Sequence, residues 1–103
     1  MELRKMLKVV IRLPGGKATG RNNIVQSIIN TCREESILGA TVTRCLFGYG
    51  EKEYKPRALL QLKDLPVIVE IVDEPLAIKQ VLPEIKQLVQ DNGLITIEEV
   101  YAI

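Results

Sequence analysis

The chain has 103 residues, 47% of them hydrophobic and 26% charged, which predicts one domain over residues 1–103 and excludes a disordered chain. Because histidine is absent, neither a Ser-His-Asp triad nor a Cys/His zinc site can be built. The 14 basic and 13 acidic residues nearly balance, but residues 1–59 hold 11 of the basic and 5 of the acidic ones. This half could attract phosphates or nucleic acid, unless the two halves simply complement each other across sheet and subunit contacts.

The first half of the chain predicts a strand, a helix and a second strand. Apolar residues alternate over residues 7–13, which is typical of a strand with one buried face. Asn22 or Asn23 is expected to cap a helix, because apolar residues recur at helical spacing over residues 24–32. Residues 41–47 are rich in β-branched side chains and predict the second strand.

A polar segment punctuated by glycine and proline, residues 48–57, predicts an exposed loop. Residues 58–62 and 66–72 are predicted to be extended, and the second of these segments is nearly continuous in apolar residues. This continuity favours a strand that has apolar surface to bury on both faces.

The clearest helical pattern is an apolar stripe over residues 78–89, at i, i+3, i+4, i+7, i+10 and i+11. We expect Asp73 to cap this helix, Pro75 to lie in its first turn and Pro83 to kink it.

An Asn-Gly pair at residues 92–93 predicts the end of the second helix, and residues 94–103 predict a last strand, bent around residues 98–99. The resulting order β-α-β-β-α-β predicts an α+β, ferredoxin-like fold. In this fold a four-stranded antiparallel sheet carries both helices on one face.

The other face of the predicted sheet has no helix to cover it. The residues expected to point away from the helices are Lys8, Val10, Arg12, Ile68, Glu70 and Val72. We expect other copies of the chain to cover this face. Glu70 would then be partly buried and would pair with a basic neighbour such as Arg12 or Arg44, because an unpaired buried carboxylate is costly.

Other functional patterns are weak. RNA-recognition modules share the element order but stack bases on aromatic residues of their central strands, and here only Phe47 and Tyr49 lie near the second strand. We therefore expect no nucleic-acid binding. The acidic pairs at residues 73–74 and 98–99 diverge, and no nucleophile has a base beside it, so no catalytic residue is predicted.

The two cysteines, Cys32 and Cys45, are 13 positions apart, and residues 1–13 lack the pattern of a secretory signal. We therefore expect reduced thiols and a cytoplasmic protein. No apolar run approaches the roughly 18 residues of a membrane span, so no membrane insertion is expected.

Four segments resemble, in order and spacing, the PII-like proteins of the domain of unknown function 190 family. They are GATVT at 39–43, FGYG at 47–50, DLPVIVEIVD at 64–73 and EEV at 98–100. The resemblance spans residues 7–103. It implies a ferredoxin-like homotrimer whose sheets line the three-fold axis, with a loop after the second strand like the T-loop of nitrogen-regulatory PII proteins.

In PII proteins small effectors, often adenine nucleotides, bind between subunits and set the conformation of this loop. The resemblance therefore implies a signalling or regulatory protein that is not an enzyme and needs no cofactor or metal. Its effector, a nucleotide or an anion, would order the loop at residues 48–57, which could contact a protein target. The glycine- and lysine-rich phosphate loop that PII proteins carry before their last strand is reduced here to residues 91–93.

The resemblance places the ligand site at the root of the loop, and the candidate anion contacts are Arg44, Lys52, Lys55 and Arg57. The predicted site residues are Arg44, Gly48, Tyr49, Gly50 and Arg57. Two alternatives stay open at this point, a metal-binding or metal-tolerance trimer of similar fold and a small-substrate enzyme at the same cleft.

Overall fold

A computed structural model describes residues 1–14, 21–46, 48–49, 53–54 and 65–103. The main elements follow in the order β1 (Arg4–Leu13), α1 (Arg21–Glu34), β2 (Ala40–Arg44), β5 (Val67–Asp73), α2 (Pro75–Val89) and β6 (Leu94–Ala102). Two short strands, β3 (Gly48–Tyr49) and β4 (Glu53–Tyr54), pair with each other between β2 and β5 in the chain. The predicted strand at residues 58–62 lies outside the described residues.

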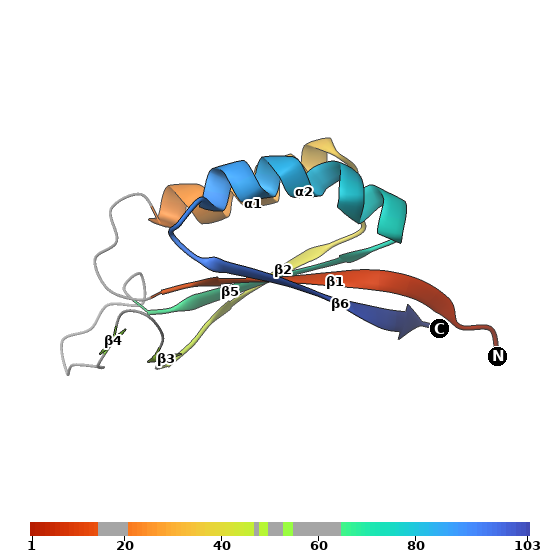
Figure 1. The fold of residues 1–103 in the computed structure, drawn as a ribbon, viewed down its shortest axis with the longest axis horizontal. Helices are drawn as coiled ribbons and strands as arrows, with labels where there is room; N and C mark the ends of the chain where they lie inside the picture. Colours follow the sequence, from red (N-terminus) through yellow and green to blue (C-terminus); the bar gives the residue numbers. More distant parts are fainter. Residues whose placement is uncertain (15–20, 47, 50–52, 55–64) are drawn as a thin grey trace.

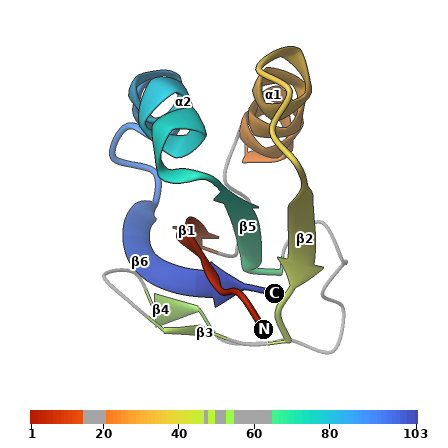
Figure 2. The ribbon, with the colours of Figure 1, turned by 90° about the vertical axis from the view of Figure 1, so that its right-hand side faces the viewer.

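The four long strands form one antiparallel sheet in the order β2-β5-β1-β6. Both helices lie on one face of this sheet, with α1 toward β2 and α2 toward β6 (Figure 1, Figure 2). The predicted ferredoxin-like fold is confirmed. Both chain termini lie at one end of the sheet, and β3 and β4 lie at the other (Figure 1).

The core fills the space between the sheet and the helices, as the apolar periodicities predict. Alternate residues of the two central strands and one stripe of each helix are buried there: Val9, Ile11, Leu13, Ile28, Cys32, Val67, Val69, Ile71, Ile78, Val81, Ile85 and Val89. Each fully buried aliphatic side chain contributes about 1.5–3 kcal/mol relative to leaving it exposed. The buried Thr31 donates a hydrogen bond to Glu84 at 3.3 Å, which links α1 to α2.

The ends of several elements differ from the prediction. Asn22 and Asn23 lie inside α1, which begins at Arg21. Neither therefore occupies the N-cap position, which precedes the first helical residue. Strand β2 ends at Arg44, three residues earlier than predicted, and the N–H of Cys45 still donates to the carbonyl of Pro66 at 2.8 Å.

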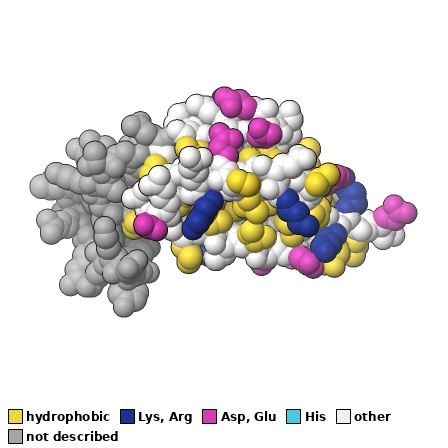
Figure 3. All heavy atoms as spheres, turned by 45° about the horizontal axis from the view of Figure 1, so that its top comes forward, with side chains coloured by type: hydrophobic (Ala, Val, Ile, Leu, Met, Phe, Trp, Pro, Cys, Tyr) yellow, Lys and Arg dark blue, Asp and Glu magenta, His cyan; other side chains and the backbone are white. Residues whose placement is uncertain are grey.

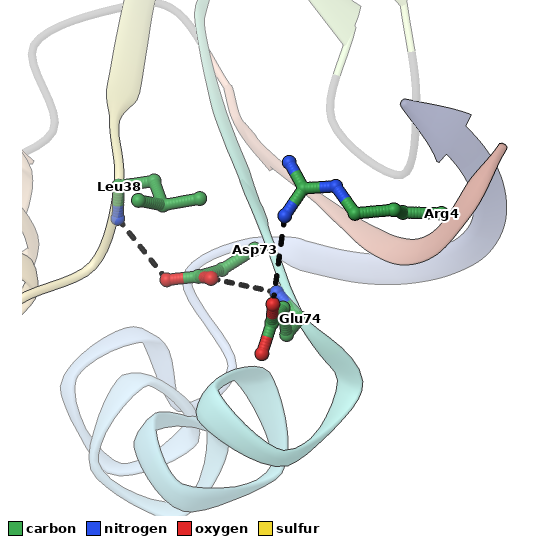
Figure 4. A network of polar contacts seen from close by, with 4 residues as sticks. All are labelled: Arg4, Leu38, Asp73 and Glu74. Atoms are coloured by element: carbon green, nitrogen blue, oxygen red, sulfur yellow. Dashed lines mark hydrogen bonds and ion pairs between the residues drawn. The ribbon is translucent and has the colours of Figure 1, made fainter. Parts of the chain in front are cut away.

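The prediction that Asp73 caps α2 is wrong. Asp73 is the last residue of β5, and Glu74 is the N-cap residue of α2. The Asp73 side chain is buried, and its two oxygens accept hydrogen bonds from the N–H groups of Leu38 at 3.1 Å and Glu74 at 2.6 Å (Figure 4). It therefore joins the α1–β2 connection to the start of α2. Pro75 lies in the first turn of α2, as expected.

Helix α2 continues through Pro83 to Val89, and the kink expected at Pro83 stays a prediction. The residue with positive φ after this helix is Gln90, at 49°, so the Asn-Gly pair is not where the helix ends. Strand β6 pairs with β1 in one unbroken register, and Figure 2 shows it curved. Since the register has no bulge, the curvature reflects the coiling of twisted strands.

Candidate functional site

The predicted ligand site lies at the end of the sheet that is opposite the chain termini. Arg44 is the last residue of β2 and is exposed, and Gly48 and Tyr49 form β3 four residues later. Gly48 pairs with Tyr54 and Tyr49 with Glu53 in the β3–β4 ladder. The structure thus brings Arg44, Gly48 and Tyr49 to one end of the sheet (Figure 1).

Two of the predicted site residues, Gly50 and Arg57, lie outside the described residues. A third arginine, which the sequence analysis did not assign to the site, lies at the same end of the sheet. Arg12 of β1 is opposite Ile68 of β5, and Arg44 of β2 is opposite Val67. Arg12 is exposed and donates a hydrogen bond from Nη1 to Oγ1 of Thr96 at 3.4 Å. The strand register places Arg12 on the face of the sheet opposite Arg44, so the two arginines share an end of the sheet but not a face.

The face of the sheet turned away from the helices is called the open face here. Because side chains alternate along a strand, the register assigns to it Arg4, Met6, Lys8, Val10, Arg12, Thr41, Thr43, Ile68, Glu70, Val72, Leu94, Thr96, Glu98, Val100 and Ala102. The predicted set of outward residues is therefore confirmed. Val10 is only 7% exposed, and Ile68 and Val72 are half-buried.

At the centre of the open face, Lys8 pairs with two carboxylates. Its Nζ lies 3.4 Å from Oε1 of Glu70 on β5 and 3.3 Å from Oε1 of Glu98 on β6. Hydrogen bonding to Glu98, and then to Glu70, raises the pKa of the Lys8 amine, so it stays protonated at neutral pH. The three residues Lys8, Glu70 and Glu98 are called the Lys8 cluster below.

Glu70 is half-buried and pairs with a basic neighbour, as predicted, but this neighbour is Lys8 and not one of the two arginines named as examples. Arg44 belongs to the helix-facing side of β2, and Arg12 donates to Thr96. Lys8 and Arg12 are both diagonal neighbours of Glu70 across the β1–β5 ladder. Only Lys8 also has a carboxylate directly opposite on β6, and this second carboxylate holds the amine between the two strands.

Edge strand β6 exposes apolar surface that the rest of the described chain does not cover. Leu94 lies on its open face, while Ile97 and Tyr101 lie on its other side, and their exposed fractions are 59%, 47% and 61%. Figure 3, with the helices tilted toward the viewer, shows hydrophobic side chains at the surface with Lys and Arg side chains among them. Apolar surface on an edge strand favours contact with another protein surface.

Both cysteines are free, and burial raises the pKa of the Cys32 thiol, so Cys32 is a core side chain in the neutral form at pH 7. Among the residues that the structure describes, no three or more Asp, Glu or Cys side chains gather where they could hold a metal ion. None of the helices in the described ranges has the length and hydrophobicity to span a membrane.

Comparison with known proteins connects this arrangement to a family. The model of the DUF190 family, described as "Uncharacterized ACR", matches residues 6–102. A UPF0166 protein of Aquifex aeolicus is 46% identical over 78 residues, which cover 74% of this chain and 72% of that protein. A UPF0166 protein of Methanocaldococcus jannaschii is 35% identical over 96 residues, which cover 92% of this chain and 87% of that protein.

Solved structures share the fold at low sequence identity. CPII of Thiomonas intermedia, a nitrogen regulatory PII-like protein bound to ADP, AMP and bicarbonate, aligns with a TM-score of 0.75 and 14% identity over 98% of this chain and 91% of that chain. A putative PII-like signaling protein of Thermus thermophilus aligns with a TM-score of 0.72 and 12% identity, over 100% of this chain and 94% of that chain. The fold is therefore that of PII-like proteins.

Proposed function

The chain belongs to the DUF190 family, and on that premise we propose that it is a PII-like regulatory protein without catalytic activity. In this proposal the protein is cytoplasmic, and its single domain assembles into a homotrimer. One observation carries this proposal. Its fold aligns over nearly the whole chain with a PII-like protein whose structure holds nucleotides and bicarbonate. The half-buried apolar residues of the open face support the assembly, since one copy leaves them partly in water.

The proposed effector is an adenine nucleotide or a small anion, bound between subunits at the loop end of the sheet. Gly48, Tyr49 and Gly50 form the root of the site, and Arg44 and Arg57 contact the anionic group. An arginine suits this role because its planar guanidinium donates two parallel hydrogen bonds to a phosphate or carboxylate. The ADP, AMP and bicarbonate in CPII are the ligand classes that support this choice.

Regulation would proceed by a shift in the population of loop conformations. An effector that favours one ordering of residues 48–57, the counterpart of the PII T-loop, must bind that ordering more tightly. Each tenfold change in the ratio of the two states requires about 1.4 kcal/mol of differential affinity. The ordered loop then presents a surface that a protein target recognises.

Titration calorimetry with ADP, AMP, ATP, bicarbonate and acetate tests the proposed site. We expect at least one adenine nucleotide to bind, and the variant Arg44→Ala to weaken that binding about tenfold, because a hydrogen bond to a charged group contributes roughly 1.5–3 kcal/mol. Arg33→Ala is the matched control, because Arg33 is an exposed arginine in the last turn of α1. Absence of heat for every compound, with folded protein, would contradict the proposed effector site.

A further inference from the structure

The Lys8 cluster spans three neighbouring strands on the open face: Lys8 on β1 lies between Glu70 on the central strand β5 and Glu98 on the edge strand β6. The Lys8 side chain is 29% exposed, the smallest exposed fraction among the cations of the four ion pairs found in the described residues. Its carboxylate partners on either side, Glu70 and Glu98, are 44% and 60% exposed. One amine is thus held by two carboxylates, and water reaches all three groups from the open side of the sheet.

Apolar residues surround the cluster on the same face. Met6 and Val10 flank Lys8 along β1 and are 3% and 7% exposed, and Val72 lies directly opposite Lys8 on β5. The face carries both signs of charge: Lys8 and Arg12 lie on it with the two carboxylates of the cluster, and Arg4, at its end, pairs with Glu74 at 3.6 Å. A face that carries both signs suits a second copy of itself better than a strongly charged partner such as nucleic acid.

We propose that the Lys8 cluster is the ionic centre of the contact between copies of this chain, and that pairing within each copy allows the open faces to close. This inference rests on the proposed trimer. Ile68 and Val72, the half-buried apolar residues of the open face, drive assembly, and the cluster makes assembly conditional on Lys8. It therefore acts as a specificity determinant of the interface.

The physical reason is that losing one partner of an ion pair costs little where water reaches the pair and much where the pair is buried. In the single copy, the carboxylates are partly exposed, so losing Lys8 leaves them hydrated and changes the stability of the fold little. Between copies the same two carboxylates would lose their water. Removal of one partner from a buried ion pair leaves an uncompensated charge, whereas replacement of the whole group by apolar side chains is often neutral or stabilising.

Sedimentation velocity over a concentration series, with circular dichroism to check folding, tests this inference on three variants. Lys8→Met leaves the two carboxylates unpaired. The triple variant Lys8→Met, Glu70→Met and Glu98→Met replaces the whole cluster by apolar side chains. Lys5→Met is the matched control, because Lys5 pairs with Glu99 at 3.2 Å across the same two strands but on the opposite side of the sheet.

We expect Lys8→Met to fold and to raise the concentration at which half of the chains are assembled by at least about 100-fold. Lys5→Met should assemble like the wild type, and the triple variant should assemble at least as tightly. The inference is overturned if Lys8→Met assembles like the control, if it does not fold, or if the triple variant folds but stays dissociated. A wild type that remains a single chain at every concentration would instead overturn the proposed trimer itself.

Discussion

At the scale of single residues, Gly93 is a position where the backbone passes so close to β1 that a Cβ atom does not fit. A Cβ placed on Gly93 would lie 2.6 Å from the carbonyl oxygen of Arg12 and 2.7 Å from Cδ2 of Leu13. The first of these atoms belongs to the backbone of the central strand β1 and cannot move aside. Gly93 therefore lets the α2–β6 connection pass against the sheet.

The variant Gly93→Ala should lower the free energy of unfolding by roughly 1–3 kcal/mol, the usual range for overpacking. Gly39→Ala is the control, because a Cβ on Gly39 has nothing within 4 Å, and its effect should stay within about 0.5 kcal/mol. Chemical denaturation of the two variants measures both values. Equal losses of stability would show that the close approach at Gly93 is not what requires glycine.

At the scale of elements, Asp73 holds the α1–β2 connection against the start of α2. Asp73→Ala would leave the N–H groups of Leu38 and Glu74 without their acceptor, and we expect the free energy of unfolding to fall by roughly 2–3 kcal/mol. The neighbouring variant Glu74→Ala should cost less than about 1 kcal/mol, because it removes only an exposed 3.6 Å pair with Arg4 (Figure 4). Thermal melting measures the loss of stability in each variant. Similar losses in both would contradict the claim that Asp73 holds the α1–β2 connection against α2.

The elements themselves follow from local pattern. The continuous apolar run of β5 predicts a strand buried on both faces, and the structure makes it a central strand with Val67, Val69 and Ile71 in the core. The apolar stripe of α2 is likewise buried against the sheet. Such patterns are readable because a strand alternates every second residue and a helix returns every 3.6 residues.

Contacts between elements are harder to predict because they depend on register. The sequence gives no means of choosing Lys8 over Arg12 as the partner of Glu70, since both are diagonal to it across the β1–β5 ladder. The role of Asp73 is hidden for the same reason, because its Leu38 partner is 35 residues away. That Arg12 and Arg44 lie at the same end of the sheet, on opposite faces, likewise depends on the strand order, whereas Gly48 and Tyr49 follow β2 within a few residues.

At the scale of the whole molecule, both helices lie on one face of the sheet, and among the described residues no helix lies on the other face. The helices bury the core side, while the open face keeps a paired lysine among apolar residues. The described residues of the predicted effector site, Arg44, Gly48 and Tyr49, lie at the end of the sheet away from the termini. In the proposed trimer other copies cover the open face, and the proposed effector binds between subunits. The proposed assembly and the proposed effector site therefore depend on each other.

Native mass spectrometry of the wild type with and without ADP tests this dependence in one measurement, because it counts chains and bound nucleotides together. We expect particles of three times the chain mass of 11.6 kDa, with ADP adding in up to three steps to these particles and not to single chains. Particles that contain only one chain, whether or not nucleotide is present, would contradict the account.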